Sequence, residues 1–326
     1  MKLDPITRAN RPKRREVLIG ENEAVSLIKD GDVIIVGGFG TVNHPMPIIR
    51  ALIRRRVKNL TVIGAATAGL EIDLLIGAGA VKKVIAPYVG AELYAPIGHC
   101  FRHAAENEEI EVYETTEYLL YSQLDAAARG LGFLPWRGGV GTSIPVLNPD
   151  YVPFKDPIHG EPYLAVPALH ADWAIIHVGQ ADIYGNGQHA GARFGDRLLS
   201  RAAERVMLTA ERIVPNSEIR KNPWATSVAY ADVVVEAPYG SHPFASHGFY
   251  VEDDEAIQEY VFASIAYQRR EMSMWNAYLD RWVTGIASHR DYVAKLSIDR
   301  LSRLESALAA WNGGQAGTAV FHGAKS

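Results

Sequence analysis

Short apolar runs alternate with amphipathic segments along most of this 326-residue chain. The run Val33–Val36 is β-branched throughout, as in a strand that is covered on both faces of a sheet. The following segment, Met46–Arg56, repeats apolar residues at helical spacing and ends in Arg54, Arg55 and Arg56, where basic side chains suit the negative end of the helix dipole. Because strands that alternate with helices build parallel sheets, the sequence predicts an α/β fold: an open, mostly parallel sheet flanked by helices.

The same strand–helix cycle recurs toward the C-terminus. The further expected strands are Leu60–Ile63, Val81–Ala86, Glu111–Tyr113, Phe133–Trp136, Leu164–Pro167, Trp173–Val178, Val206–Thr209 and Val233–Ala237. The further expected helices are one capped by Asn22 and ending at Asp30, then Glu71–Ile76, Tyr94–Glu106, Glu117–Arg129, Glu255–Arg270 and Ser297–Trp311.

Prolines are dense and periodicity disappears between Ile144 and Pro162. Long segments without periodicity are usually functional or disordered loops, so we expect a Pro-rich inserted loop there. The resulting organisation is a basic N-terminal extension over residues 1–20, a single domain over 21–311 and a flexible Gly-rich tail over 312–326.

Composition excludes several classes of protein. No apolar run approaches the length of a membrane helix, and residues 1–16 lack the apolar core of a secretory signal. The single cysteine, Cys100, fits a reducing compartment, so we expect a cytoplasmic protein with no membrane partner. The formal net charge of −4 gives no reason to expect nucleic acid as a partner, and the basic residues between Arg8 and Arg15 are interpreted as a solvated extension.

Two glycine-rich turns follow expected strands. The first is Gly37-Gly38-Phe39-Gly40 and the second is Gly138-Gly139-Val140-Gly141-Thr142. Glycine lets the backbone approach a ligand closely and turn its N–H groups toward an anion. Neither turn fits the dinucleotide fingerprint or the P-loop. Because ligands of open α/β sheets bind at strand carboxyl ends, both turns are candidate binding segments.

Two glutamates, Glu114 and Glu117, stand beside Thr115 and Thr116 at the start of an expected helix. One interpretation is structural, with Thr-x-x-Glu-like capping and compensation of the helix dipole. The other is catalytic, with a carboxylate acting as general acid or base. Both interpretations stay open.

The histidines give weak signals for a metal site. His99 and His103 stand four residues apart around Cys100, but no third ligand follows at a suitable spacing, so we expect no bound metal. His242 lies in a turn-rich segment after an expected strand, where loops surround the active sites of α/β proteins. It is a candidate binding residue.

Taken together, these segments resemble the family I CoA-transferases, and within them the α-type subunits of the glutaconate CoA-transferase kind. The resembling segments are the Gly37–Gly40 turn with Pro45 and Pro47, His177–Asn186 ending in Ala-Asp-x-x-Gly-Asn, Leu75–Lys82, Gly132–Pro135, Glu218–Arg220 and Ala237–Pro243. Their order covers the chain from about Asn22 to Leu304.

The resemblance implies a transferase that moves CoA between an acyl-CoA and a carboxylic or dicarboxylic acid, with CoA as substrate and no permanently bound cofactor. A glutamate attacks the thioester in such enzymes, and glycine-loop amides stabilise the oxyanion. The implied ligand-binding residues are Gly37, Gly38, Phe39, Gly40, Gly139, Gly141, Thr142 and His242.

The resemblance also implies a β-type partner, in a heterodimer or heterotetramer, that carries the nucleophilic glutamate in a Glu-x-Gly loop. Neither Glu21 nor Glu305 is followed by the required glycine, so we expect the chain to be inactive alone. Many family members carry glutamine where this chain has Glu117. A branch that hydrolytically opens rings of steroid-derived CoA esters is similar here and carries glutamate, which leaves a CoA-ester hydrolase or C–C lyase using Glu117 as the alternative.

Two further alternatives are a non-catalytic sensor or isomerase relative that binds phosphosugars, and a nucleotide-binding dehydrogenase. The first requires a basic phosphate pocket that the sequence does not locate. The second requires a dinucleotide-binding glycine fingerprint that the glycine turns of this chain do not fit. The expected substrate-facing segments are Ala65–Glu71 and Ile144–Pro162.

Overall fold

The computed structural model describes residues 14–64 and 67–310 of the chain. Most of the basic cluster, and the tail 312–326, therefore lie outside the described residues. Within the described part, nine strands form one sheet and three more form a second, smaller sheet. No helix there is long and apolar enough to cross a membrane.

The main sheet confirms the predicted mostly parallel α/β architecture. Seven strands pair in parallel in the order β12-β10-β8-β1-β2-β3-β4, and two short strands extend one end of β8 in antiparallel pairing. The parallel strands are β1 (Val33–Val36), β2 (Leu60–Gly64), β3 (Val81–Ile85), β4 (Glu111–Val112), β8 (Ala171–Ala181), β10 (Ala203–Ile213) and β12 (Val233–Glu236); the antiparallel pair is β9 (Gly187–Gln188) and β11 (Thr226–Val228).

The strand order reverses between β1 and β8. From β1 the chain proceeds outward through β2, β3 and β4, and from β8 it proceeds in the other direction through β10 and β12. Open α/β sheets bind ligands at such a switch point, outside the carboxyl ends of the strands. The carboxyl end of β1 is therefore the first place to look for a site.

Alternate residues of each central strand enter two different cores. In β1, Ile34 and Val36 pack in one core whereas Ile35 packs in the other, and all three side chains are buried. The first core also receives α1 (Glu21–Ser26), α2 (Met46–Arg54), α3 (Leu70–Gly77), α4 (His99–Glu106), α9 (Asp254–Gln268) and α10 (Met272–Leu279). The second receives α5 (Glu117–Ala128) and α7 (Asp196–Ala202). Burial of a strand on both faces explains its continuous apolar run.

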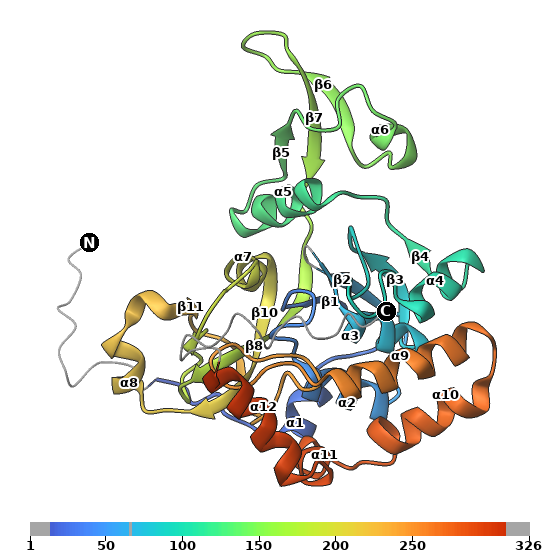
Figure 1. Ribbon diagram of the computed structural model, residues 1–326. Coiled ribbons are helices and arrows are strands. Elements are labelled where there is room, and N and C mark those ends of the chain that lie inside the picture. The colour runs from blue at the N-terminus through green and yellow to red at the C-terminus, as the bar shows by residue number, and fades with distance from the viewer. Residues whose placement is uncertain (1–13, 65–66, 311–326) are drawn as a thin grey trace, which may run out of the picture.

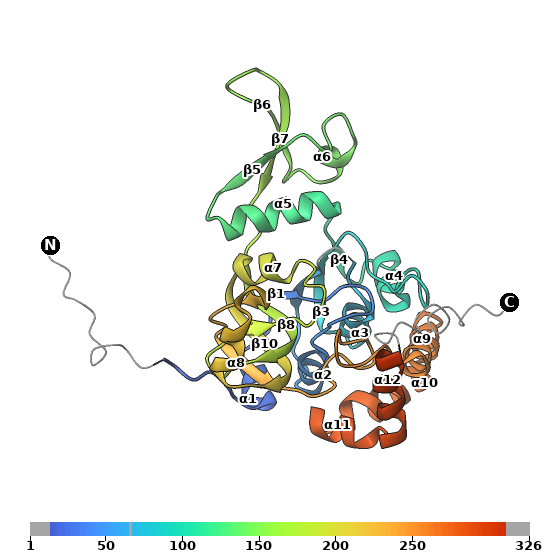
Figure 2. The ribbon, with the colours of Figure 1, turned by 60° about the vertical axis from the view of Figure 1, so that its left-hand side comes forward.

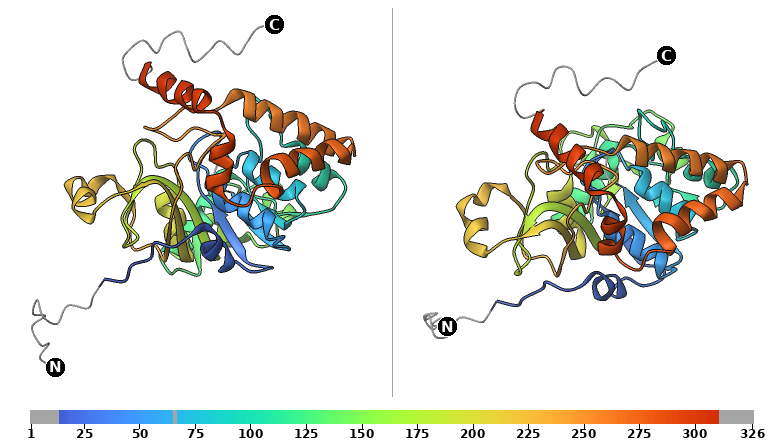
Figure 3. Two further views of the ribbon diagram at one scale, coloured as in Figure 1. Left: turned by 90° about the horizontal axis from the view of Figure 1, so that it is seen from below. Right: turned by 60° about the horizontal axis from the view of Figure 1, so that its bottom comes forward.

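The remaining helices lie around this body. They are α8 (Asn216–Lys221), η2 (Pro223–Ala225), η3 (Asp280–Thr284), α11 (His289–Lys295) and α12 (Ile298–Ala310). Seen from below, the C-terminal helices, coloured orange to red, run together along one side of the molecule (Figure 3), whereas α8, coloured gold, lies on the opposite side.

The segment expected to be a Pro-rich loop is instead part of a small antiparallel sheet, so that prediction was wrong. Strands β5 (Phe133–Trp136), β7 (Pro162–Pro167) and β6 (Val152–Lys155) pair in the order β5-β7-β6, and α6 (Ile144–Leu147) precedes β6. Figures 1 and 2 show this sheet projecting beyond α5. Proline is tolerated in edge strands, which lack one row of ladder bonds. Strands β5 and β7 match the expected strands Phe133–Trp136 and Leu164–Pro167, whereas Pro153 in the edge strand β6 hid the strand pattern there.

Two helix starts also differ from expectation. Helix α1 begins after Gly20 rather than at a cap on Asn22, and it ends at Ser26. Helix α4 begins at His99 rather than Tyr94, because Ala95 forms a tight turn with Ala91 and the residue before Pro96 is disfavoured in a helix. Val17 and Ile19, within the predicted extension, exchange backbone hydrogen bonds with Val234 of β12.

Candidate functional site

The first glycine turn lies at the switch point, immediately after β1. Gly37 N donates to Ile175 O of β8 at 2.9 Å. A Cβ atom on Gly37 would lie 2.7 Å from Asp196 Oδ1, and Gly38 has a φ of +99°. The close approach of Asp196 at one position and the left-handed backbone at the next explain why glycine stands at both.

The backbone amides of this turn all donate hydrogen bonds to other groups of the chain. Gly38 N donates to Asp196 Oδ1 at 3.2 Å, Phe39 N to Val42 O at 2.9 Å and Gly40 N to Thr67 O at 3.0 Å. In this conformation the turn offers close backbone approach and a rigid shape rather than free N–H groups. The predicted binding role of Gly37, Gly38, Phe39 and Gly40 stays a prediction.

A buried carboxylate–histidine pair supports the turn from the other side of the switch point. Asp196, at the start of α7, contacts His189 Nε2 through Oδ2 at 2.8 Å, and His189 Nδ1 lies 2.6 Å from Ser227 Oγ. Asp196 is fully buried and His189 is 5% exposed. Sequence reasoning missed these residues, because nothing in the order of residues brings Gly38, His189 and Ser227 together.

A second buried pair lies beneath the same turn. His44 Nε2 lies 2.9 Å from Gly40 O, and His44 Nδ1 lies 3.3 Å from Glu71 Oε2. Glu71 Oε1 accepts the amide of Gly69 at 3.0 Å. Burial raises the pKa of Glu71, and the neighbouring His44 opposes that rise. The pair therefore joins the glycine turn to part of the segment Ala65–Glu71, of which residues 65–66 are outside the described residues.

A cavity of about 460 Å³ opens beside the carboxyl end of β8, with His189 in its wall. Two arginines also line it. Arg212 donates through Nε and Nη2 to Gln180 Oε1 at 3.1 and 2.8 Å, and Arg193 donates to the carbonyl of Trp224. Gln180 in turn donates to Gln188 at 2.8 Å. The cavity is thus polar, and its side chains are held in place by neighbours.

Glu117 is the first residue of α5 and is exposed. The helix is capped by Thr116, whose Oγ1 accepts the amide of Leu119 at 3.4 Å, so Glu117 is not the glutamate of a capping box. Its position still suits the helix dipole. Among residues 14–64 and 67–310 its side chain forms no hydrogen bond or salt bridge, and its predicted catalytic role stays a prediction.

Tyr121 links Glu117 to the switch point. It lies one helical turn after Glu117, and its hydroxyl would be 2.8 Å from a Cβ on Gly195, the residue before Asp196. Burial raises the pKa of Tyr121 to about 12, with smaller contributions from the charges of Glu117 and Asp196. Helix α5 therefore packs against the start of α7, which carries the Asp196 that braces the glycine turn.

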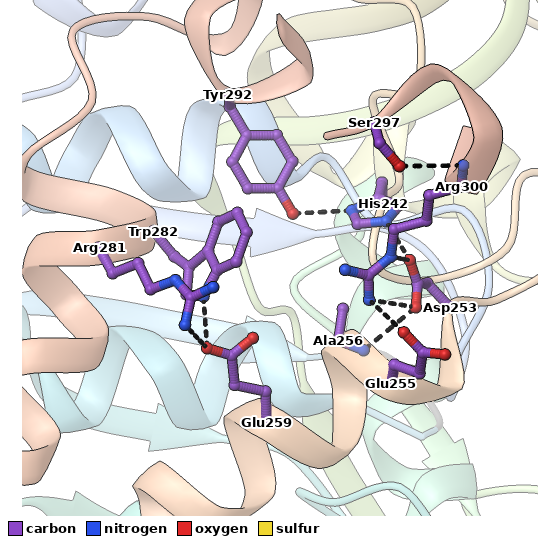
Figure 4. A network of polar contacts seen from close by, with 10 residues as sticks. All are labelled: His242, Asp253, Glu255, Ala256, Glu259, Arg281, Trp282, Tyr292, Ser297 and Arg300. Carbon is purple, nitrogen blue, oxygen red and sulfur yellow. Dashed lines mark hydrogen bonds and ion pairs between the residues drawn. The ribbon is translucent and has the colours of Figure 1, made fainter. Parts of the chain in front are cut away.

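His242 is fully buried in a polar network on the α9 side (Figure 4). Its Nδ1 lies 2.7 Å from the hydroxyl of Tyr292 and its Nε2 lies 2.9 Å from Asp253 Oδ2, while Arg300 also donates to Asp253. Burial lowers the pKa of His242. Because both ring nitrogens are engaged, the network accounts for His242 structurally, and its predicted ligand role stays a prediction.

The second glycine turn does not lie at the carboxyl edge of the parallel sheet. It follows β5 of the small sheet, and Thr142 Oγ1 donates to Gly139 O at 2.7 Å. The expectation that Gly139, Gly141 and Thr142 follow a strand of the open parallel sheet was therefore wrong, because β5 pairs with β7 in the small antiparallel sheet. Whether they bind a ligand stays a prediction.

The other sequence candidates have ordinary surroundings. His99 Nδ1 lies 3.1 Å from Gln268 Oε1, and His103 Nε2 lies 3.7 Å from Glu109. Among the described residues no group of three histidine, cysteine, aspartate or glutamate side chains could hold a metal ion.

Comparison with known proteins identifies relatives for most of the chain. Residues 21–237 match the profile of the family described as coenzyme A transferase. The α-type (A) chain of glutaconate CoA-transferase from Acidaminococcus fermentans is 30% identical over 311 residues, which cover 89% of this chain and 94% of the relative. The crystal structure of that transferase superposes with a TM-score of 0.83 at 28% identity, covering 88% of this chain and 95% of the other.

Two further relatives are a hydrolase subunit and a protein that is longer than this chain's match to it. The cholesterol ring-cleaving hydrolase IpdA subunit of Mycobacterium tuberculosis is 34% identical over 264 residues, covering 78% of this chain and 89% of the relative. An uncharacterised protein of Archaeoglobus fulgidus is 38% identical over 291 residues, covering 87% of this chain. The match spans only 64% of the Archaeoglobus protein's own length.

Proposed function

The chain belongs to the coenzyme A transferase family, and from that premise we propose that it is the α-type subunit of a heteromeric CoA-transferase. The proposed enzyme moves CoA between an acyl-CoA and a carboxylic or dicarboxylic acid. The observation that carries the proposal is the glycine turn at the switch point, braced by Asp196 beside a cavity of about 460 Å³. Its relatives include the α-type chains of several named transferases, which supports the proposal.

The proposed nucleophile is a glutamate of a β-type partner. No glutamate in this sequence is followed two residues later by glycine, so the Glu-x-Gly loop has to come from another chain. The partner's glutamate attacks the thioester and expels CoA thiolate, which leaves a mixed acyl-glutamyl anhydride. The thiolate then attacks the glutamyl carbonyl, releases the donor carboxylate and gives a glutamyl-CoA thioester, and the acceptor carboxylate runs the same steps in reverse. We expect no turnover by this chain alone.

The glycine turn has a defined part in this scheme. Its amides donate hydrogen bonds to Asp196, Val42 and Thr67. We therefore propose that the turn lets the ligand approach the backbone closely, and that it does not supply the N–H donors of an oxyanion hole. Groups that stabilise the oxyanion then come from the partner or from other segments of this chain.

One observation favours a second candidate, a subunit of a CoA-ester hydrolase or ring-opening C–C lyase. Glu117 is exposed, lies one helical turn before Tyr121, which packs beside the start of α7, and is unpaired among the described residues. A carboxylate in that setting serves as a general base. The IpdA relatives, named as cholesterol ring-cleaving hydrolases, have comparable identity to this chain.

The deciding experiment uses the chain purified with its β-type partner. The complex is incubated with a panel of acyl-CoAs, with and without acetate or glutarate, and thioester exchange is followed by mass spectrometry. New CoA esters that form only with an acceptor establish the transferase. Free CoA or a ring-opened product without an acceptor establishes the second candidate instead.

The variant Glu117→Gln separates the roles of this carboxylate, with Glu23→Gln, at an exposed glutamate in the first turn of α1, as the matched control. In the transferase the Glu117→Gln complex keeps activity within about threefold, because a helix-dipole contact is all that is lost. In the hydrolase it loses about a hundredfold or more, as when a general base is removed.

A further inference from the structure

Two exposed aromatic rings are stacked over the switch point. The rings of Phe39 and Phe194 have centroids 4.8 Å apart and an interplanar angle of 9°. Phe39 is 37% exposed and Phe194 is 38% exposed. Phe39 belongs to the glycine turn after β1, and Phe194 precedes α7, so two segments on either side of the strand-order reversal build this aromatic pair.

The backbone holds Phe194 in an unfavourable conformation to present its ring. Its φ is +44°, a region that bulky side chains rarely adopt. Residues on either side of it are anchored: Arg193, directly before it, donates to the carbonyl of Trp224, and Asp196, two residues after it, contacts Gly38 and His189. Such strain persists where the surroundings impose it, and it is concentrated at functional sites.

The pair lies between the features already described. The ring of His247 is 6.0 Å from that of Phe194, and Gly191 and Arg193, just before Phe194, line the cavity of about 460 Å³. On the other side, the hydroxyl of Tyr121, one turn from Glu117, would lie 2.8 Å from a Cβ on Gly195. The aromatic pair therefore adjoins residues of the cavity wall on one side and the segment beside Tyr121 on the other.

We propose that Phe39 and Phe194 bind the acyl group of the CoA ester and select for bulky apolar acyl groups over short ones. This inference rests on the proposed function of the chain. Exposed aromatic faces gain by covering apolar surface and by offset stacking, and a cyclic acyl group offers both. An acetyl group covers too little of either ring to use them. The pair thus sets substrate class while leaving the reacting carbonyl to other residues.

Direct binding to the complex of this chain with its β-type partner tests the inference. The dissociation constants of cyclohexanecarbonyl-CoA and acetyl-CoA are measured by isothermal titration calorimetry. The variant is Phe194→Asn, because asparagine tolerates a positive φ and so keeps the turn while removing the ring. Phe194→Tyr restores an aromatic face. Phe262→Asn, at a 68% exposed position of α9, is the matched control.

The expected result is selective. Phe194→Asn weakens binding of cyclohexanecarbonyl-CoA by about tenfold or more, in line with the loss of an apolar pocket contact, and changes acetyl-CoA by less than about twofold. Phe194→Tyr and Phe262→Asn keep the wild-type ratio. Phe39→Ala reproduces the loss through the other ring.

Equal weakening of both ligands, or an unchanged ratio, overturns the inference. Failure of Phe194→Asn to assemble with the partner in size-exclusion chromatography, while Phe194→Tyr assembles, also overturns it, because the pair then contacts the partner chain. The proposed function fails separately, when the wild-type complex binds these esters without exchanging CoA in the presence of an acceptor.

Discussion

The carboxylate of Asp196 accepts the backbone amide of Gly38 at 3.2 Å, although 158 residues separate the two in sequence. The bond ties the start of α7 to the turn after β1, across the point where the strand order reverses. It also fixes the second oxygen of Asp196 against His189 at 2.8 Å. One buried side chain thereby determines the shape of the candidate site.

We expect Asp196→Ala to lower the free energy of unfolding by about 2–4 kcal/mol, because it leaves the Gly38 amide and the His189 ring without their buried partner. Urea unfolding of the purified chain measures this. Asp125→Ala, which breaks an i,i+4 pair with Arg129 on the surface, is the control and should cost under about 0.5 kcal/mol. Equal effects for the two variants would contradict the bracing role of Asp196.

Gly37→Ala should destabilise the chain by about 1–3 kcal/mol, since the new methyl group would meet Asp196 Oδ1 at 2.7 Å and Ile176 at 3.1 Å. Gly132→Ala is the matched control, because no atom lies within 4 Å of its added Cβ. That change should stay within about 1 kcal/mol of wild type in either direction. Thermal melting of both variants side by side makes the comparison, and a neutral Gly37→Ala would show that the turn moves freely.

Stability should fall as the pH drops below about 6.5, in part because of His289. Burial, followed by the charge of Arg50, lowers the pKa of His289 from 6.5 to about 3. Between those values the unfolded chain binds a proton that the folded chain does not, so acid favours unfolding by up to about 1.4 kcal/mol per pH unit. Burial lowers the pKa of His242 too, which acts in the same direction.

The variant His289→Gln isolates that contribution. Between pH 7.0 and 5.5 its free energy of unfolding in urea should fall by about 1 kcal/mol less than that of wild type. His159→Gln, at an exposed position of the small sheet's connecting turn, should follow the wild-type curve. Parallel curves for wild type and His289→Gln would rule out a neutral buried His289.

Tyr151→Phe should loosen the attachment of the small sheet to α5. The hydroxyl of Tyr151 donates to Gln123 Oε1 at 3.1 Å and lies 2.7 Å from Thr115 Oγ1, and its ring is fully buried. Loss of the hydroxyl leaves buried partners unsatisfied, at about 1–2 kcal/mol. Hydrogen exchange of the β5–β7 amides should become faster, whereas Tyr163→Phe on β7 should leave it unchanged. Unaltered exchange in Tyr151→Phe would place the attachment elsewhere.

The regular part of this fold was predictable because each central strand carries its own signal. Val33–Val36 is apolar at every position, and the structure buries alternate residues in two cores. Helices such as Met46–Arg54 carry the matching periodicity. Two strands of the small sheet, β5 and β7, match strands expected from the sequence, whereas β6 was missed because Pro153 interrupts the alternation by which strands are recognised.

The residues of the candidate site also divide into those that the sequence predicted and those that it did not. Glycines after an expected strand predicted a turn at Gly37–Gly40. The order of this turn and the other resembling segments along the chain indicated the family. The residues that contact that turn could not be predicted from the sequence. Asp196 accepts the amide of Gly38, and Phe194 stacks on Phe39. His189 contacts both Asp196 and Ser227. Local sequence determines local backbone preference and burial, whereas the order of parallel strands decides which distant side chains meet. For this protein, sequence alone determined the class of fold and the family, and the tertiary structure decided which residues stand together at the switch point.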